Sequence, residues 1–308
     1  MAIIPFVNVP NRFICQYLPM PTNAVIVALA EVRREFETLR VGKEDLLRLL
    51  DESEVPESVY NSNAIENSTL TLADTERILL AVEISRHMDL REVHEAQNLA
   101  RVVGYIRANH AERLTLDRMR LLHQMLLANI DSEIAGRFRI SGEYVRVGTH
   151  IAPAPENVDQ MLADMLVRFA SDLGVHPVDR LARVHLEFEH IHPFVDGNGR
   201  IGRVVLNYLL YQLGFPPIIE RTKGKEKYYA MLREFDTKGN VKPFAQHLSL
   251  LMLESMHRRI AYLKGARIAP AVDVARERSI GVSVVLNQAR RQVIPAFRER
   301  GVWKLPAD

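Results

Sequence analysis

The chain has 308 residues, 47% of them hydrophobic and 25% charged, and its formal net charge is +2. This is the composition of a globular protein with a large core, and the near balance of charge gives no sign of a nucleic-acid or membrane partner. Cys15 is the single cysteine, which excludes an intramolecular disulfide and is consistent with a reducing compartment. No run approaches the ~18 apolar residues of a membrane span. We therefore expect a cytoplasmic protein without membrane contact.

The first 90 residues predict a helical region behind an irregular arm. Residues 1–20 contain three prolines and no periodicity, whereas helices are expected over 23–40 and 43–50. Pro56 is expected to open another short helix that runs through Asn67. Within it, Ser62 and Glu66 are four residues apart and share one face, a spacing that is common on solvated helices.

The middle of the chain predicts further helices and one hairpin. Thr71 with Asp74, and Asp89 with Glu92, resemble N-capping pairs of two helices that end near residues 87 and 110. A helix is expected over 115–130, and its His123 is taken as incidental to chemistry. Residues 138–140 and 144–147 predict the strands of a short β-hairpin between residues 136 and 155, with an ordinary connecting hairpin as the alternative. Further helices are expected over 155–170, 177–189 and 225–238, and around 244–252.

The stretch from His192 to Arg203 reads His-Pro-Phe-Val-Asp-Gly-Asn-Gly-Arg-Ile-Gly-Arg and leads into a helical pattern. Gly197, Asn198 and Gly199 can adopt positive φ, so their N–H groups can converge on an anion. The positive end of the helix that begins here favours the same ligand. The pattern predicts a phosphate site.

The charged residues of this stretch fit phosphate chemistry. Arg200 and Arg203 are three residues apart, so both guanidinium groups can face the same side and bind phosphate oxygens. Asp196 offers a hard oxygen ligand of the kind that Mg2+ uses beside nucleotide phosphates. His192 is then available as a general base.

Other interpretations of the same stretch fit less well. A simple turn would leave the arginines unexplained, and a calcium-binding EF-hand loop needs glycine and glutamate where this chain has Ile201 and Asn207. A zinc hydrolase built on His185, His190 and His192 has no helical ligand pair.

The stretch resembles the signature of the Fic family, His-Pro-Phe-x-[Asp/Glu]-Gly-Asn-Gly-Arg-x-x-Arg, and meets every fixed position. The similarity covers about residues 55–260. It implies an all-α, mainly α-helical Fic fold with a catalytic core over 91–262, a signature loop and helix over 192–213 and a β-hairpin flap over about 136–155. Ser62 and Glu66 match the family's inhibitory motif, Ser/Thr-x-x-x-Glu-Gly/Asn, on a helix over about 56–67.

The resemblance implies a protein adenylyltransferase that uses ATP as co-substrate and Mg2+ as cofactor. AMP would pass to a Tyr, Thr or Ser hydroxyl of a target protein that docks on the flap near residues 144–150, and to the protein itself. Pairing of Glu66 with Arg203 would inhibit the enzyme. Asn207, Tyr228, Tyr229 and Asn240 are expected near the adenine. The alternative enzymatic activity is removal of AMP with Glu66 orienting water, and a homodimer is left open.

The C-terminal region, residues 263–308, is rich in arginine. It predicts a helix from residue 275, a turn at Gly281 and a second helix ending at Gly301, similar to the helix-turn-helix appended to many Fic proteins. Pro295 interrupts the second helix, and no wing is expected before Asp308. The region is therefore predicted either to be a solvated docking tail or to bind DNA, and in the second case the chain would be a regulator with a nucleotide-sensing Fic core.

Overall fold

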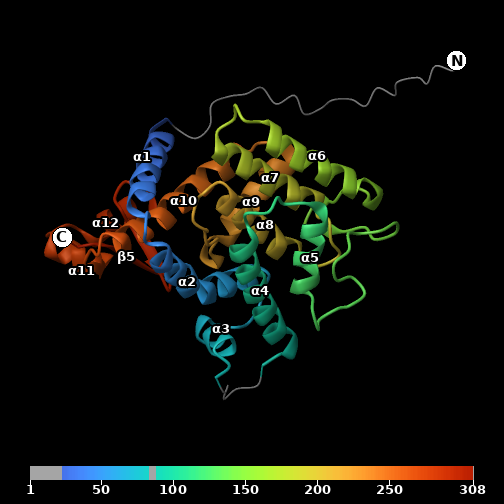
Figure 1. Ribbon diagram of the computed structural model, residues 1–308, viewed down its shortest axis with the longest axis horizontal. Helices are drawn as coiled ribbons and strands as arrows, with labels where there is room; N and C mark the ends of the chain where they lie inside the picture. The colour runs from blue at the N-terminus through green and yellow to red at the C-terminus, as the bar shows by residue number, and fades with distance from the viewer. Residues whose placement is uncertain (1–22, 83–87, 308) are drawn as a thin grey trace.

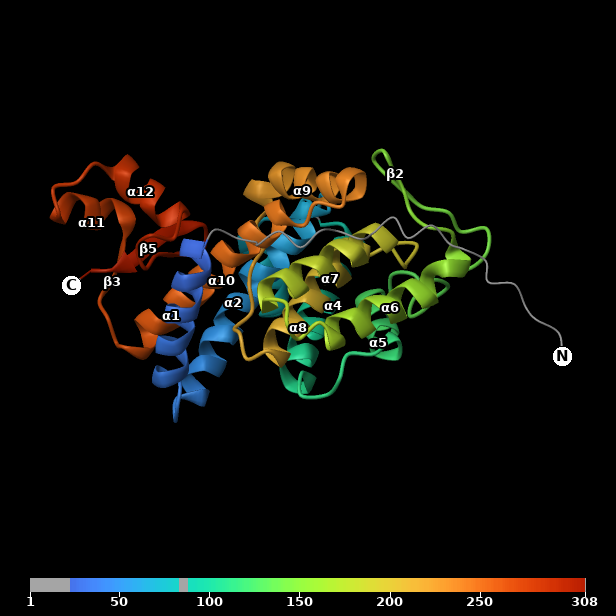
Figure 2. The same ribbon diagram turned by 90° about the horizontal axis from the view of Figure 1, so that it is seen from above.

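The computed structural model describes residues 23–82 and 88–307. Two central helices, α7 (Pro177–Ile191) and α8 (Asn198–Gln212), are surrounded by the others (Figures 1 and 2). The surrounding helices are α1 (Asn23–Leu39), α2 (Glu44–Ile65), α3 (Leu72–Leu79), α4 (Leu90–Asn109), α5 (Leu116–Leu126), α6 (Val158–Ser171), α9 (Lys225–Lys238) and α10 (Lys242–Leu263). Short 3-10 turns, η1 (Pro155–Asn157) and η2 (Thr222–Gly224), precede α6 and α9. The expected mainly α-helical fold is confirmed.

Burial explains why α8 lies at the centre. Most of its residues between Asn198 and Leu210 are buried, as in a helix covered by others on several sides. Its residues Ile201, Val205 and Leu209 are at most 1% exposed, and it contacts α2, α4, α5 and α7. The signature loop, residues 192–197, is therefore held between two buried helices.

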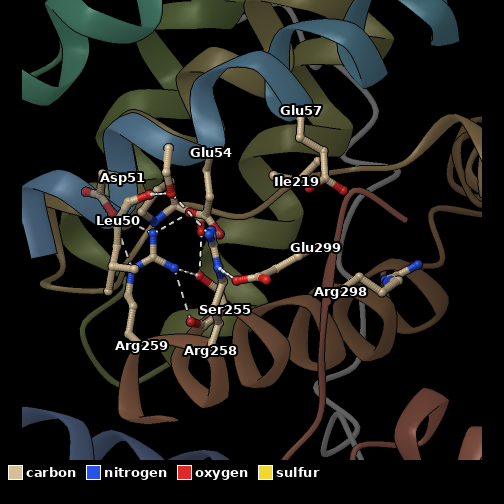
Figure 3. Close-up of polar contacts among 12 residues, drawn as sticks. Leu50, Asp51, Glu54, Glu57, Ile219, Ser255, Arg258, Arg259, Arg298 and Glu299 are labelled. Carbon is tan, nitrogen blue, oxygen red and sulfur yellow. Dashed lines mark hydrogen bonds and ion pairs between the residues drawn. The ribbon is translucent and has the colours of Figure 1, made fainter. Parts of the chain in front are cut away.

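The helix that carries Glu66 is longer than the sequence predicts. It was expected to begin at Pro56, yet α2 starts at Glu44 and Pro56 lies inside it. A proline within a helix costs one hydrogen bond, but the preceding turns are fixed by ion pairs to α10. Arg259 lies 2.5 Å from Asp51 and 2.6 Å from Glu54 (Figure 3). These contacts hold the N-terminal half of α2 in place.

The predicted caps are partly confirmed. Thr71 and Asp74 form a capping box at α3, and the Asp89 side chain accepts the N–H of Arg91 at the start of α4. Glu92 instead accepts the N–H and hydroxyl of Thr69. The helix expected over 115–130 already ends at residue 126. The arm over residues 1–20 and the helix end near residue 87 lie outside the described residues.

A short hairpin follows α5, as expected, but its strands are displaced. β1 (Arg146–Val147) pairs antiparallel with β2 (His150–Ile151). The strand expected over 138–140 is absent from the described structure because the Arg139 side chain binds backbone carbonyls there, and the Glu143 N–H donates to the Ile140 carbonyl in a turn. We call residues 144–151 the flap. Figure 2 shows it on the same side of α7 as α9.

The C-terminal region is a small unit with its own core, next to α1 and α10 (Figures 1 and 2). It contains β3 (Ile268–Pro270), α11 (Ala271–Glu277), α12 (Val282–Arg290), β4 (Phe297–Glu299) and β5 (Val302–Pro306), with sheet order β3-β5-β4. The second helix ends at residue 290 instead of 301, and the expectation that no wing follows is wrong. Arg300 and Gly301 adopt positive φ and turn the chain into a hairpin.

This unit is fixed to the helical core by ion pairs. Arg298 binds Glu254 at 2.6 Å. Arg258 binds Glu299 at 3.0 Å (Figure 3). Arg300 pairs with Glu76 of α3. Arg298 and Arg300, two arginines of the arginine-rich C-terminal region, thus form ion pairs with the helical core. Within the described ranges, no helix is both long and apolar enough to span a membrane.

Candidate active site

A cavity of about 630 Å³ lies above the signature loop. The loop, the first turn of α8, the C-terminal end of α2, the flap, α9, the start of α4 and the end of α7 all line it. Of the predicted site residues, His192, Asp196 to Arg200, Arg203, Glu66, Tyr228 and Tyr229 all line it. The structure therefore brings the predicted phosphate site and the predicted inhibitory residue into one space.

His192 is presented to the cavity by the end of α7. It adopts the left-handed conformation, with φ 50° and ψ 62°, while its N–H donates to the Phe188 carbonyl at 2.9 Å. Such a conformation is unusual for a residue with a side chain and is often found at functional positions. Nδ1 lies 3.2 Å from the Glu189 carbonyl oxygen. A carbonyl only accepts, so Nδ1 carries the proton and Nε2 keeps its lone pair.

The protonation state of His192 suits a base. Burial lowers the pKa of His192 to about 4, and the positive charge of Arg139 acts in the same direction. The imidazole is therefore neutral near pH 7, and its Nε2 can accept a proton.

The signature loop is closed by hydrogen bonds and by ring stacking. The Asn198 side chain accepts the Phe194 N–H and donates to the Phe194 carbonyl, both at 2.8 Å. The Phe194 ring stacks on His123 with ring centroids 3.8 Å apart. His123 Nε2 donates to the Asp196 carbonyl at 3.0 Å, and Nδ1 accepts the Gly136 N–H. The prediction that His123 is incidental is wrong, because this buried residue on α5 positions the loop.

Arg139 ties the signature loop to the segment that leads into the flap. This arginine is 3% exposed. Its guanidinium donates to the carbonyl oxygens of His192, Ile191, Glu143 and Pro153. Sequence reasoning missed it, although an arginine within the apolar stretch Phe138–Ile140 could have drawn attention.

The first turn of α8 directs backbone N–H groups without a helical partner toward the cavity. Ile201 makes the first N–H bond of the helix, to Gly197, so the preceding amides have no partner inside the helix. Gly197 has φ 77°, which favours glycine. A Cβ on Gly199 would lie 2.2 Å from Glu66 Oε1. The Glu66 carboxylate thus lies directly against the helix backbone, at the place where a phosphate would bind.

Both Glu66 and Ser62 bind the Arg203 guanidinium. The resemblance implies the pairing with Glu66. Arg203 Nη2 lies 2.9 Å from Glu66 Oε1, and Nε donates to Ser62 Oγ at 3.0 Å. Nη2 also donates to the Ser62 carbonyl at 2.9 Å. Burial opposes the charge of Arg203, but Glu66, Tyr228 and Glu189 together more than offset this effect, and the pKa of Arg203 is raised.

The end of α2 is fixed by a C-terminal cap. Asn67 adopts φ 69° and the Ser68 N–H donates to the Asn63 carbonyl at 3.0 Å. Asparagine and glycine tolerate this left-handed position best, which explains why either can follow the glutamate in the motif. Tyr229 donates its hydroxyl to the Ile65 carbonyl at 2.9 Å. The residues predicted to be inhibitory are therefore held by α9 as well as by α8.

Asp196 and Arg200 form a second charged group. Asp196 Oδ2 binds Arg91 at 2.7 Å, and its Oδ1 accepts the Gly197 N–H at 2.6 Å. Arg200 is 4% exposed and binds Glu95 at 3.1 Å. A carboxylate 40% exposed at the cavity, with Glu95 nearby, fits the oxygen ligands that Mg2+ takes together with substrate phosphates and water.

A buried layer lies beneath Arg203. Burial raises the pKa of Glu189 to about 8, so this carboxyl is mostly protonated near pH 7. A Cβ on Gly202 would lie 2.2 Å from Glu189 Oε1, so a larger residue there would have to displace the Glu189 carboxyl. Tyr228, 2% exposed, bonds His185 Nε2 at 2.8 Å. Sequence reasoning did not single out Glu189, because one glutamate on an amphipathic helix carries no local signal.

The four residues expected near the adenine divide into two pairs. Tyr228 and Tyr229 line the cavity, and Tyr228 is the buried one of the two. Asn207 lies outside this cavity and makes two hydrogen bonds to the Ile218 backbone. Asn240 bonds Glu234 and also lies outside it.

The chain is similar to known proteins of one family. Residues 113–210 match the model of the Fic/DOC family. A protein adenylyltransferase Fic of Drosophila virilis is 32% identical over 232 residues, which are 73% of this chain and 46% of that protein. The chain thus spans less than half of that relative.

Solved structures show the same fold. A Fic domain containing signaling protein from Bacteroides thetaiotaomicron has a TM-score of 0.70 at 27% identity, over 77% of this chain and 97% of that one. A Fic family protein from Desulfovibrio desulfuricans, 20% identical, covers 95% of this chain and 99% of that one with a TM-score of 0.64. The chain therefore contains a domain of the Fic/DOC family and is a homologue of Fic proteins.

Proposed function

We propose that the protein is an adenylyltransferase that transfers AMP from ATP to a hydroxyl group of a target protein, and that Glu66 holds it in an inhibited state. The observation that carries the proposal is the position of His192. Its neutral imidazole, with Nε2 free, lines the same cavity as the amides and arginines at the start of α8. A base beside a phosphate site is the arrangement that nucleotidyl transfer needs. The curated relatives named protein adenylyltransferase support this choice.

The reaction follows from the roles of these groups. The target hydroxyl gives its proton to His192 Nε2 while its oxygen attacks the α-phosphorus of ATP. The bond from that phosphorus to the pyrophosphate oxygen breaks, and pyrophosphate leaves. The amides of α8 and Arg200 stabilise the charge on the phosphates, and Arg203 binds the γ-phosphate. Mg2+ held by Asp196 would supply further positive charge to the phosphates.

Inhibition follows from competition for Arg203. The Glu66 carboxylate takes the Nη2 donor and fills the space over Gly199. ATP would then bind with its α-phosphate displaced from His192. A displacement of ~1 Å can lower a rate by ~10²-fold, so this contact is sufficient to keep the enzyme nearly silent.

The flap is suited to hold the target chain. Its residues 147–150 line the cavity, and Tyr144, Val147 and Ile151 are exposed apolar side chains. An extended peptide can add to such a strand edge through backbone hydrogen bonds. The docking segment is therefore the one predicted near residues 144–150.

Labelled ATP tests the proposal. Glu66→Gly protein incubated with cell lysate should retain label from α-labelled ATP and none from γ-labelled ATP, on other proteins and on itself. Label retained from the γ position would mean phosphoryl transfer and would contradict the proposal. Arg203→Ala in the same background should remove most of the signal.

Removal of AMP is a second candidate activity, favoured by the exposure of Glu66. Its side chain is 36% exposed at the cavity, and only Oε1 contacts Arg203 among the described residues. The other oxygen can orient a water molecule. If Glu66 serves that reaction, Glu66→Gly protein will lose the ability to remove AMP from a modified target, and the release of free AMP measures this.

A further inference from the structure

Three metal-ligating side chains converge at the edge of the cavity, and AMP transfer as described above uses none of them. His150 lies on β2 of the flap, His190 lies near the end of α7 and Asp236 lies on α9. Their ligand atoms all lie within 4.8 Å of one another. Segments far apart in the sequence therefore bring two imidazoles and a carboxylate to one point.

The distances suit a small divalent ion. His190 Nδ1 lies 2.8 Å and His150 Nδ1 3.8 Å from the same oxygen, Asp236 Oδ1. Ligands of tetrahedral zinc lie ~2.0–2.2 Å from the metal and hence about 3.4 Å from one another. The two observed separations lie on either side of that value. The shorter one is a hydrogen bond from the His190 Nδ1–H to the carboxylate, and a bound ion would replace this proton.

The hydrogen bonding of His150 has the form found in metal-bound histidines. His150 Nε2 lies 2.8 Å from the His190 carbonyl oxygen, and a carbonyl only accepts, so Nε2 carries the proton. The lone pair of a neutral His150 is then on Nδ1, on the side of the Asp236 carboxylate. A histidine that donates one N–H to a carbonyl and presents the other nitrogen to a metal is the usual arrangement. A cation between Nδ1 and the carboxylate would relieve the repulsion of their lone pairs.

We infer that His150, His190 and Asp236 form a binding site for a divalent transition metal, with zinc as the best fit. Two imidazoles and one carboxylate are typical of zinc and other first-row metals, whereas Mg2+ and Ca2+ take oxygen ligands. The site is thus different in chemistry from Asp196. Three protein ligands leave one tetrahedral position for water, and the half-buried side chains allow the ion to enter.

The site would fix the flap to the catalytic core. Each flap strand has only two residues, and an isolated two-stranded hairpin is marginally stable. A metal shared by β2, α7 and α9 would restrain the flap. One of its ligands, His190, lies two residues before His192 in the sequence. The effect on target modification rests on the proposed function, but the metal site itself does not.

Zinc binding to the tag-free, full-length protein tests the inference. Protein treated with chelator and then dialysed is titrated with zinc chloride by calorimetry in excess Mg2+. We expect one zinc ion per chain. Loss of an outer-shell partner alone weakens metal binding ~10- to 100-fold, so His150→Ala and Asp236→Asn should each weaken it by at least about 100-fold. His94→Ala, which removes a histidine of α4 outside the cluster, should bind as the unmodified protein does.

Hydrogen exchange supplies the second readout. Zinc should slow exchange of the flap amides, residues 144–151, in the unmodified protein and in His94→Ala. In Asp236→Asn, zinc should not change the exchange rates of these amides. Asparagine preserves the shape of Asp236, so a folded variant is expected, and its melting curve checks this. Absence of stoichiometric zinc binding, or equal affinity in the unmodified protein and Asp236→Asn, would overturn the inference. Neither result depends on whether AMP is transferred.

Discussion

Replacement of Glu66 by glycine is the change with the largest expected effect on activity. The substitution removes the carboxylate that lies 2.9 Å from Arg203 Nη2 and empties the space over Gly199. A hydrogen bond to a charged group contributes about 1.5–3 kcal/mol. Since about 1.4 kcal/mol corresponds to a factor of ten in rate, freeing Arg203 should accelerate AMP transfer by about 10- to 100-fold.

The fold should survive this change. Arg203 keeps its hydrogen bonds to the Ser62 hydroxyl and carbonyl, so α2 stays docked and the unfolding free energy should fall by only about 1–3 kcal/mol. Initial rates of label incorporation from α-labelled ATP measure the acceleration. Glu44→Gly, an exposed change at the start of the same helix, is the matched control and should leave the rate unchanged. A folded Glu66→Gly protein with an unchanged rate and unchanged ATP affinity would refute the role given to Arg203.

Three further changes test other parts of the structure. Burial lowers the pKa of His185 to about 3, so the unfolded chain takes up a proton that the folded chain does not. The unfolding free energy should therefore fall as pH decreases from 6.5 toward 3, and urea titrations should show a shallower fall in His185→Gln. Arg259→Met leaves Asp51 and Glu54 without their shared partner and should lower the unfolding free energy by about 3–5 kcal/mol in the same assay. A decrease below about 1 kcal/mol would contradict the role given to these ion pairs. Asn198→Ala removes two hydrogen bonds that close the signature loop. It should lower the unfolding free energy by about 1–3 kcal/mol and abolish most of the AMP transfer. A thermal melt that matches the unmodified protein would contradict this.

The meeting of the signature residues around one cavity could be predicted from sequence because the information is local. Glycines, two arginines, an aspartate and a histidine within twelve positions constrain one another, and the structure places them around one cavity. The pairing of Glu66 with Arg203 joins residues 137 positions apart. Spacing on a helix could not indicate that contact, and only the family resemblance did.

Other features depend on tertiary contacts that the sequence does not show locally. Proline at position 56 suggested a helix start, but ion pairs from α10 extend α2 past it. His123 and Arg139 looked unremarkable because their partners are backbone carbonyls of the signature loop and the segment before the flap. Asn207 was expected near the adenine, yet it bonds the Ile218 backbone. In each case a distant backbone or charge decides where a polar side chain lies.

The most direct test of base catalysis at His192 is the intact mass of Glu66→Gly protein incubated with ATP, compared with that of the Glu66→Gly, His192→Ala double variant. The first should gain the mass of AMP by self-modification. The second should form this product ~10²- to 10⁴-fold more slowly, because it lacks the base, while it still binds ATP. Equal rates in the two proteins would contradict the role of His192 as the group that accepts the proton of the attacking hydroxyl.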